Sequence, residues 1–145
     1  MGSETSEKSW EPSEEEVKAS LQELHQSIVA LATSPLDAFA VLLNKWDTWE
    51  GERVQALEDW NLRHELGADK NEVARRYALS KGRLLAVERR LVERLKEMSE
   101  DEREMAFSKS FVLQLSGFIK VVACKKELRG RLRVAVLHTD GKQAV

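Results

Sequence analysis

The stretch VARRYALSKGRLLAVERRL, residues 73–91, decides how the rest of the chain is organised. Apolar residues recur at helical spacing on both sides of Ala78-Leu79-Ser80. We therefore expect a short helix, a tight turn at residues 78–80 and a longer basic helix that begins at Ser80. The buried stripe of that second helix would consist of Leu84, Val87, Leu91 and Leu95.

This arrangement is typical of a helix-turn-helix. The motif needs a small residue where its helices cross and a hydroxyl that caps the second helix, and Ala74 and Ser80 occupy those positions. Ala78 stands where the turn usually has a glycine, and a left-handed alanine there would cost about 1–2 kcal/mol. A packed domain tolerates that cost. The spacing predicts a helix-turn-helix over residues 69–98.

The segment VARRYALSKGRLLAVERRLVERL, residues 73–95, resembles the C-terminal half of region 4 of bacterial sigma factors. The likeness covers residues 52–98 if the preceding helix is included. It implies a recognition helix that enters the major groove of double-stranded DNA. The first 50 residues are acidic and lack the aromatic, basic helix that melts a promoter, so a complete sigma factor is excluded.

The resemblance implies that Lys81 and Arg83 face the groove and that Arg75 contacts a phosphate. Helical geometry adds further candidates for phosphate contacts, namely Arg76, Arg89 and Arg90. Such contacts position a protein on DNA but carry no sequence information. The expected function is therefore transcriptional regulation through DNA binding that depends mainly on phosphates.

Three positions depart from the family pattern. Gly82, Leu85 and Ala86 replace the polar side chains that would contact bases. The alternative is therefore a non-enzymatic adaptor that uses the same helices to bind RNA polymerase or another protein. Leu85 would then be a contact, and the arginines would face an acidic partner. A third alternative is a three-helix core with a solvated basic face.

Tryptophan is frequent for this length, with four residues, of which three lie between Lys45 and Asn61. We expect Trp46 and Trp49 to fill the core between two helices. The alternative is that they anchor a partner, because tryptophan is enriched at interface hot spots. Trp10 lies outside the expected helices.

Charge is segregated along the chain although the net charge is only -2. Residues 70–96 contain nine Lys or Arg and only three acids, Glu72, Glu88 and Glu93. Residues 1–34 contain seven Glu against Lys8 and Lys18. The acidic N-terminal helix is thus a candidate either for docking a partner or for covering the basic face, in which case it would act as a mimic of DNA.

The composition favours a mainly α-helical, compact domain with a short C-terminal β-strand or hairpin. We expect a flexible acidic tail over residues 1–12 and a single helical domain over residues 13–145. Helices are expected over residues 13–33, 35–51 and 52–66, and from Ser99 onward. Residues 108–124 favour a helix, with two strands broken at Ser116-Gly117 as the alternative. Residues 131–138 have strand spacing and could pair with residues 142–145.

The sequence lacks the patterns that carry enzyme chemistry. His25, His64, His138 and Cys124 do not have metal-ligand spacing, so we expect no metal, no cofactor and no enzymatic activity. No apolar run approaches the roughly 20 residues of a membrane span. A single cysteine favours a reducing, cytoplasmic location. Homodimerisation stays open, and MGSETS fits either a myristoylation signal or a cloning remnant.

Overall fold

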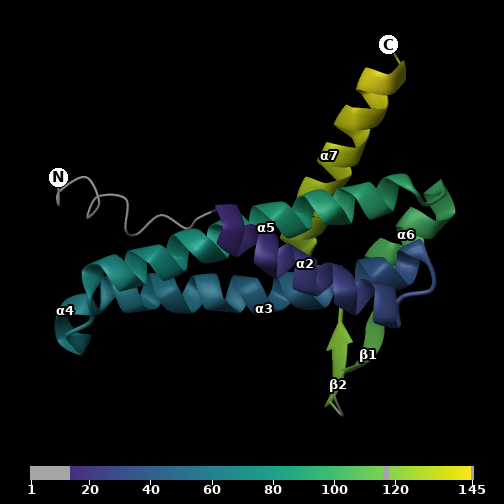
Figure 1. The fold of residues 1–145 in the computed structure, drawn as a ribbon. Coiled ribbons are helices and arrows are strands. Elements are labelled where there is room, and N and C mark those ends of the chain that lie inside the picture. The colour runs from purple at the N-terminus through teal and green to yellow at the C-terminus, as the bar shows by residue number, and fades with distance from the viewer. Residues whose placement is uncertain (1–13, 116–117, 145) are drawn as a thin grey trace.

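A computed structural model describes residues 14–115 and 118–144 (Figure 1). These residues form six helices and one two-stranded hairpin, which confirms the expected mainly α-helical, compact fold with a small β element. The elements are α2 (Glu14–Leu31), α3 (Pro35–Asn61), α4 (Arg63–Leu66), α5 (Lys70–Lys96), α6 (Glu100–Ser108), β1 (Phe111–Leu115), β2 (Phe118–Val122) and α7 (Lys126–Ala144). The tail expected over residues 1–12 and Trp10 lie outside the described residues.

Two long helices, α3 and α5, lie side by side and are joined at one end by α4 (Figure 1). Each is 27 residues long, and their apolar stripes form most of the core. The fully buried residues at this contact include Phe39, Leu42, Leu43, Val87, Leu91 and Leu95. Each such side chain contributes about 1.5–3 kcal/mol through removal from water. The α3–α5 pair is therefore the frame on which the other elements pack.

The predicted helix starts are confirmed at three positions. The Ser34 hydroxyl accepts a hydrogen bond from the Asp37 amide, and the Asp69 carboxylate accepts one from the Asn71 amide. Ser99 and Glu102 form a reciprocal capping box at the start of α6. Gly67 ends α4 with a φ of 63°, the left-handed conformation that glycine adopts without strain.

The predicted turn at residues 78–80 is wrong, because α5 is one continuous helix. Ser80 does not cap a second helix: its side chain is buried, and its hydroxyl donates to the Arg76 carbonyl at 2.9 Å. This bond to the preceding turn satisfies a serine inside a helix. Neither Ala78 nor Leu79 breaks a helix, and the buried stripe runs without interruption from Val73 to Leu95. The chain therefore has no helix-turn-helix over residues 69–98.

Replacing Ala78 by glycine distinguishes the continuous helix from a turn by the sign of the effect. In α5 the glycine should lower the free energy of unfolding by about 1 kcal/mol, because it gains more freedom in the unfolded chain. In a left-handed turn the same change would raise stability. Urea denaturation measures the difference, and Ala86→Gly in the same helix should show a comparable loss.

Helix α3 continues through Gly51, where the sequence predicted one helix to end and another to begin. The expected segments 35–51 and 52–66 are therefore one helix to Asn61, followed by the short α4. Apolar side chains on both sides of the glycine, such as Trp49 and Ala56, are buried on the same side of the helix. Their packing against α5 outweighs the roughly 1 kcal/mol that an internal glycine costs.

Replacing Gly51 by alanine should stabilise the protein by about 0.4–1 kcal/mol, because the unfolded chain loses freedom and the helix does not change. A Cβ added at Gly51 meets no atom within 4 Å. Thermal unfolding monitored by circular dichroism measures the effect. Gly67→Ala, at a left-handed position, should have the opposite sign.

The C-terminal third corrects two further predictions. Strands β1 and β2 pair antiparallel, with Phe111 opposite Val122, so the two-strand alternative is right and the favoured helix is wrong. The predicted break at Ser116-Gly117 lies outside the described residues. Residues 131–138 belong to helix α7, and the predicted strand there and its pairing with residues 142–145 are wrong. The helical stripe of α7 that is buried consists of Leu128, Leu132 and Val136, whereas Val134 is exposed. In Figure 1 the hairpin and α7 project from opposite sides of the bundle.

One face of the hairpin packs on the core, and the other is open. Phe111 and Val122 are buried, and the Phe111 ring meets Phe39 edge-on with a centroid distance of 6.5 Å. The opposite face carries three exposed apolar side chains, Val112, Ile119 and Val121. Both faces are thus apolar, which explains why the sequence lacks the alternation that marks a half-buried strand.

Candidate functional site

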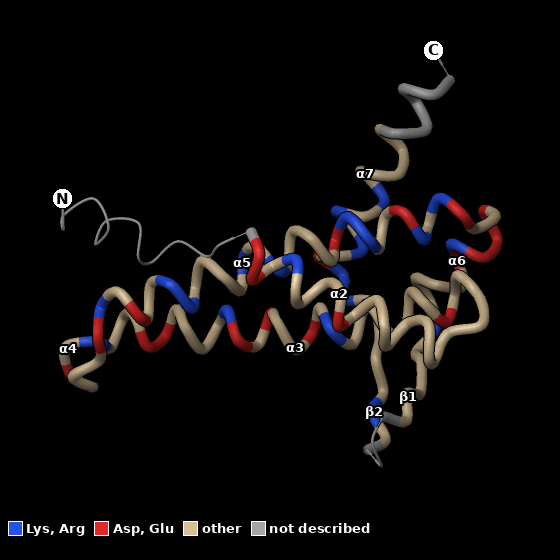
Figure 2. Tube along the Cα trace, viewed as in Figure 1, with Lys and Arg blue, Asp and Glu red and all other residues tan. Residues whose placement is uncertain are grey.

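Four of the six cations predicted to contact DNA form ion pairs within the described chain. Arg75 pairs with Glu16 of α2. The other three pairs are Arg76–Asp59 at 3.0 Å, Arg83–Glu52 at 3.6 Å and Arg90–Glu93 at 3.3 Å. Figure 2 shows the same interleaving of cationic and acidic positions along α3 and α5. The basic sequence of α5 is therefore neutralised in large part by neighbouring carboxylates.

The predicted groove-facing pair, Lys81 and Arg83, does not share a surface. Residues two apart on a helix differ by about 200° in direction. The Arg83 guanidinium donates to the Ser20 hydroxyl of α2 at 2.9 Å. Lys81 is exposed on the other flank, with its ammonium 5.6 Å from the centre of the Tyr77 ring. The two flanks of α5 therefore face different neighbours.

Helix α2 covers the flank of α5 that carries Arg75 and Arg83, as the charge pattern predicted for the acidic N-terminal helix. Gly82 lies beneath it, and a Cβ at this position would be 3.4 Å from Val17 Cγ2. The small residue that interrupts the family pattern is thus a contact point for α2. Its presence is explained by packing within the chain.

The two tryptophans at the centre of α3 belong to the core. Trp46 is 6% exposed and Trp49 is 3% exposed, so the expectation of a core role is confirmed. A cation lies over each ring. The Lys125 ammonium is 5.6 Å from the centre of the Trp46 ring, and the Arg83 guanidinium is 5.7 Å from the centre of the Trp49 ring. The alternative in which they anchor a partner does not fit this burial.

The flank of α5 opposite α2 carries a hollow surface that the sequence did not reveal. A cleft of about 670 Å³ lies between α3, α5 and the start of α7, and a groove of about 420 Å³ continues between α5 and α7. Both are lined by Leu85, Glu88 and Arg131, so they form one surface. We call this cleft and groove together the α5–α7 surface.

Leu85 lies at the junction of the cleft and the groove and is 59% exposed. The groove beside it has an apolar floor made by half-buried Val92 and buried Leu132. Leu85 is one of several exposed large apolar side chains in the described chain, and exposure alone is ordinary. Its position between two hollows distinguishes it. Of the predicted partner contacts Leu85, Trp46 and Trp49, Leu85 is the one that lines both hollows, and Trp46 lines the cleft with its side chain buried.

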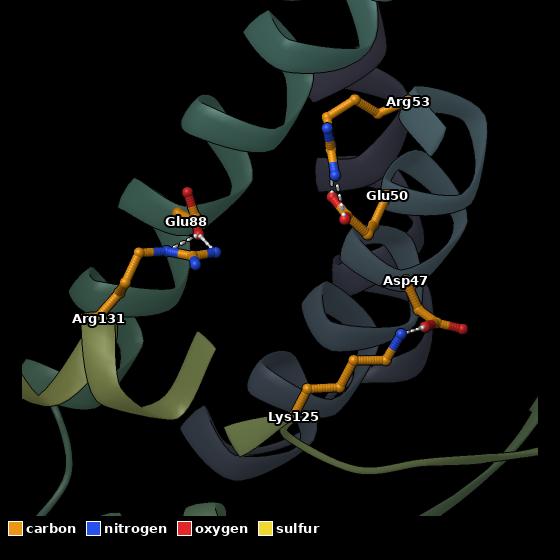
Figure 3. A network of polar contacts seen from close by, with 6 residues as sticks. All are labelled: Asp47, Glu50, Arg53, Glu88, Lys125 and Arg131. Atoms are coloured by element: carbon orange, nitrogen blue, oxygen red, sulfur yellow. Dashed lines mark hydrogen bonds and ion pairs between the residues drawn. The ribbon is translucent and has the colours of Figure 1, made fainter. Parts of the chain in front are cut away.

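Ion pairs fix the walls of this surface (Figure 3). The Arg131 guanidinium of α7 donates to Glu88 Oε1 of α5 at 2.6 and 3.0 Å. On α3, Arg53 pairs with Glu50 at 2.7 Å. The Asp47 carboxylate of α3 forms ion pairs with the ammonium groups of Lys120 and Lys125, each at 3.1 Å. The Arg131–Glu88 pair joins α7 to α5, and Asp47 joins α3 to β2 and to Lys125, the residue before α7, across sequence separations that a pattern of residues does not disclose. The Arg53–Glu50 pair lies within α3.

Two carboxylates of α3 titrate below their ordinary range. Partial burial opposes ionisation of Asp47, but hydrogen bonds and charge from Lys120 and Lys125 outweigh it and lower its pKa. The hydrogen bond from Arg53 lowers the pKa of Glu50, against a smaller opposing effect of burial. Both groups therefore stabilise the folded state above the pKa of the unfolded chain, about 4, and lose that contribution as the pH falls through their folded pKa.

Replacing Asp47 by asparagine should reduce the dependence of stability on pH below about pH 4. At neutral pH the variant should lose about 0.2–1 kcal/mol, because two exposed ion pairs are removed. Urea denaturation at a series of pH values measures both effects. Glu58→Gln, an exposed α3 carboxylate without an ion pair among the described residues, should leave the neutral stability unchanged. Equal acid profiles for the wild type and Asp47→Asn would contradict the assignment.

No group of three or more His, Cys, Asp or Glu in the described residues has a geometry that could hold a metal ion. Cys124 is buried, and burial raises the pKa of its thiol to about 11, as expected for an unreactive cysteine. None of the described helices is both long and apolar enough to cross a bilayer.

Comparisons with known proteins found no matching family model, no matching curated protein and no matching solved structure. The resemblance to sigma region 4 therefore stays a prediction. The turn at residues 78–80, on which that resemblance depends, is absent from the structure.

Proposed function

We propose that this chain is a non-enzymatic protein-binding module and that its contact site is the α5–α7 surface. This is the adaptor alternative of the sequence interpretation, transferred from a helix-turn-helix to a groove between two packed helices. A groove with an apolar floor and a polar rim is the usual receptor for an amphipathic helix from another protein. The partner in that alternative is RNA polymerase or another protein.

The observation that supports this function is the exposure of Leu85 between two hollows. Leu84 and Val87, close to it in α5, are buried in the core. Leu85 is not needed to fill the core and is exposed to solvent. Interfaces concentrate their binding energy in a few such anchors, surrounded by a polar rim. Here the rim is formed by charged side chains of α5 and α7.

The geometry supports protein binding better than DNA binding. A recognition helix needs an exposed end that can enter the major groove. Residues 80–90 instead lie in the middle of α5, between α2 on one flank and α7 on the other. Glu16 and Asp59 also place negative charge beside two predicted phosphate contacts, Arg75 and Arg76. Glu52 does the same beside Arg83, which was predicted to face the groove.

Site-specific photo-crosslinking tests the proposed surface. Benzoylphenylalanine at position 85 should yield covalent adducts with another protein in the cells that produce this chain. The same crosslinker at position 29 should yield none, because Val29 is comparably exposed but lies on α2, away from the surface. Equal labelling from both positions would contradict the proposal, and so would adducts that contain only a second copy of the chain.

Duplex DNA provides the opposing measurement. Fluorescence anisotropy at physiological salt should show no binding tighter than the nonspecific range of about 10⁻⁴ to 10⁻⁶ M. Tighter binding that is abolished by charge reversal of Arg83 and Arg90 would favour the DNA-binding alternative instead. Circular dichroism of each variant shows that the helices are retained.

A further inference from the structure

Resting on the proposed function, we infer that the partner contributes an acidic amphipathic helix to the α5–α7 surface. Its apolar side chains would cover Leu85 and the groove floor, and its carboxylates would meet four cations at the rim. Those cations are Lys81, Arg89, Lys96 and Lys126.

These four cations have no carboxylate partner among the described residues. Most acids that line the same surface already form ion pairs within the chain: Glu88 with Arg131, Glu93 with Arg90 and Glu50 with Arg53. Glu127 is the one lining acid without an ion pair in the described chain. The surface therefore carries an excess of positive charge that is not neutralised internally, in contrast to the flank covered by α2.

The cations are arranged along a line that suits a helix. On α5, Lys81, Leu85 and Arg89 follow at intervals of four residues, and Val92 and Lys96 continue the stripe. From Lys81 to Lys96 the stripe is about 22 Å long at 1.5 Å per residue. A partner helix of about 15 residues would match this length, with apolar residues facing Leu85 and Val92 and acids at its edges.

An acidic protein segment fits this surface better than a nucleic-acid backbone does. Exposed Leu85 and half-buried Val92 form an apolar strip between the cations, with buried Leu132 beneath it. Phosphates and sugars cannot cover this strip without loss of hydration. Glu127, the lining acid without an ion pair in the described chain, lies on the same surface and would repel a phosphate beside it. Separate carboxylates on a helix can meet the cations individually and avoid this acid.

A random peptide library displayed on phage tests the inference without knowledge of the natural partner. Selection against the full chain, with Leu85→Glu for counter-selection, should enrich peptides that combine Leu, Ile or Trp at helical spacing with Asp or Glu. Enrichment of neutral or basic peptides that still depend on Leu85 would overturn the acidic partner and leave the proposed function standing. Absence of any enrichment that depends on Leu85 would overturn both.

The affinity of the best selected peptide provides the second measurement. Reversal of Lys81 and Arg89 to glutamate should weaken binding roughly ten-fold, and a rise in salt should weaken it for the wild type. Lys70→Glu, at the exposed far end of α5, should have no comparable effect. Affinity that is unchanged by Lys81→Glu/Arg89→Glu and independent of salt would overturn the role of these cations.

Discussion

The contact between α3 and α5 is the constraint on which the rest of the molecule depends. Both helices run for 27 residues, and their facing stripes remain buried across positions where the sequence offers an interruption. At Gly51 a local cost of about 1 kcal/mol competes with several buried side chains worth about 1.5–3 kcal/mol each, and packing carries α3 through the glycine. At Ala78 the helix preference of alanine and the packing of the buried stripe act together, so α5 has no turn there.

Once the pair is formed, the two flanks of α5 acquire different roles. The flank that carries Arg75 and Arg83 is covered by α2, whose Glu16 and Ser20 receive those guanidinium groups. The other flank receives α7, whose buried Leu128 and Leu132 anchor it and whose Arg131 reaches Glu88. The hollow surface exists because α7 crosses α5 and leaves Leu85 uncovered beside it.

Helix starts and the core were predictable from the sequence because their signals are local: Ser34, Asp69 and Ser99 cap helices, and Trp46 and Trp49 are buried. The β-hairpin and α7 were not predictable in this way. Apolar residues on both faces of the hairpin have a spacing that also fits a buried helix, and residues 131–138 alternate as in a strand although they are helical. Leu85, Lys81, Arg89 and Trp46 of the candidate surface were predicted as contact residues from the sequence, but for separate roles and not as one surface. Its other walls depend on pairs such as Glu88–Arg131, which are 43 residues apart in the chain.

The open face of the hairpin also affects how the protein behaves in concentrated solution. This face has an uncharged patch of three β-branched side chains, Val112, Ile119 and Val121. In the described chain β1 and β2 pair only with each other, so the outer edge of each strand is unpaired. Unpaired edges of this kind are templates for intermolecular β-sheet and fibril growth. A lysine on this face would act as a gatekeeper residue. We therefore expect colloidal stability to depend on this patch, which is separate from the α5–α7 surface.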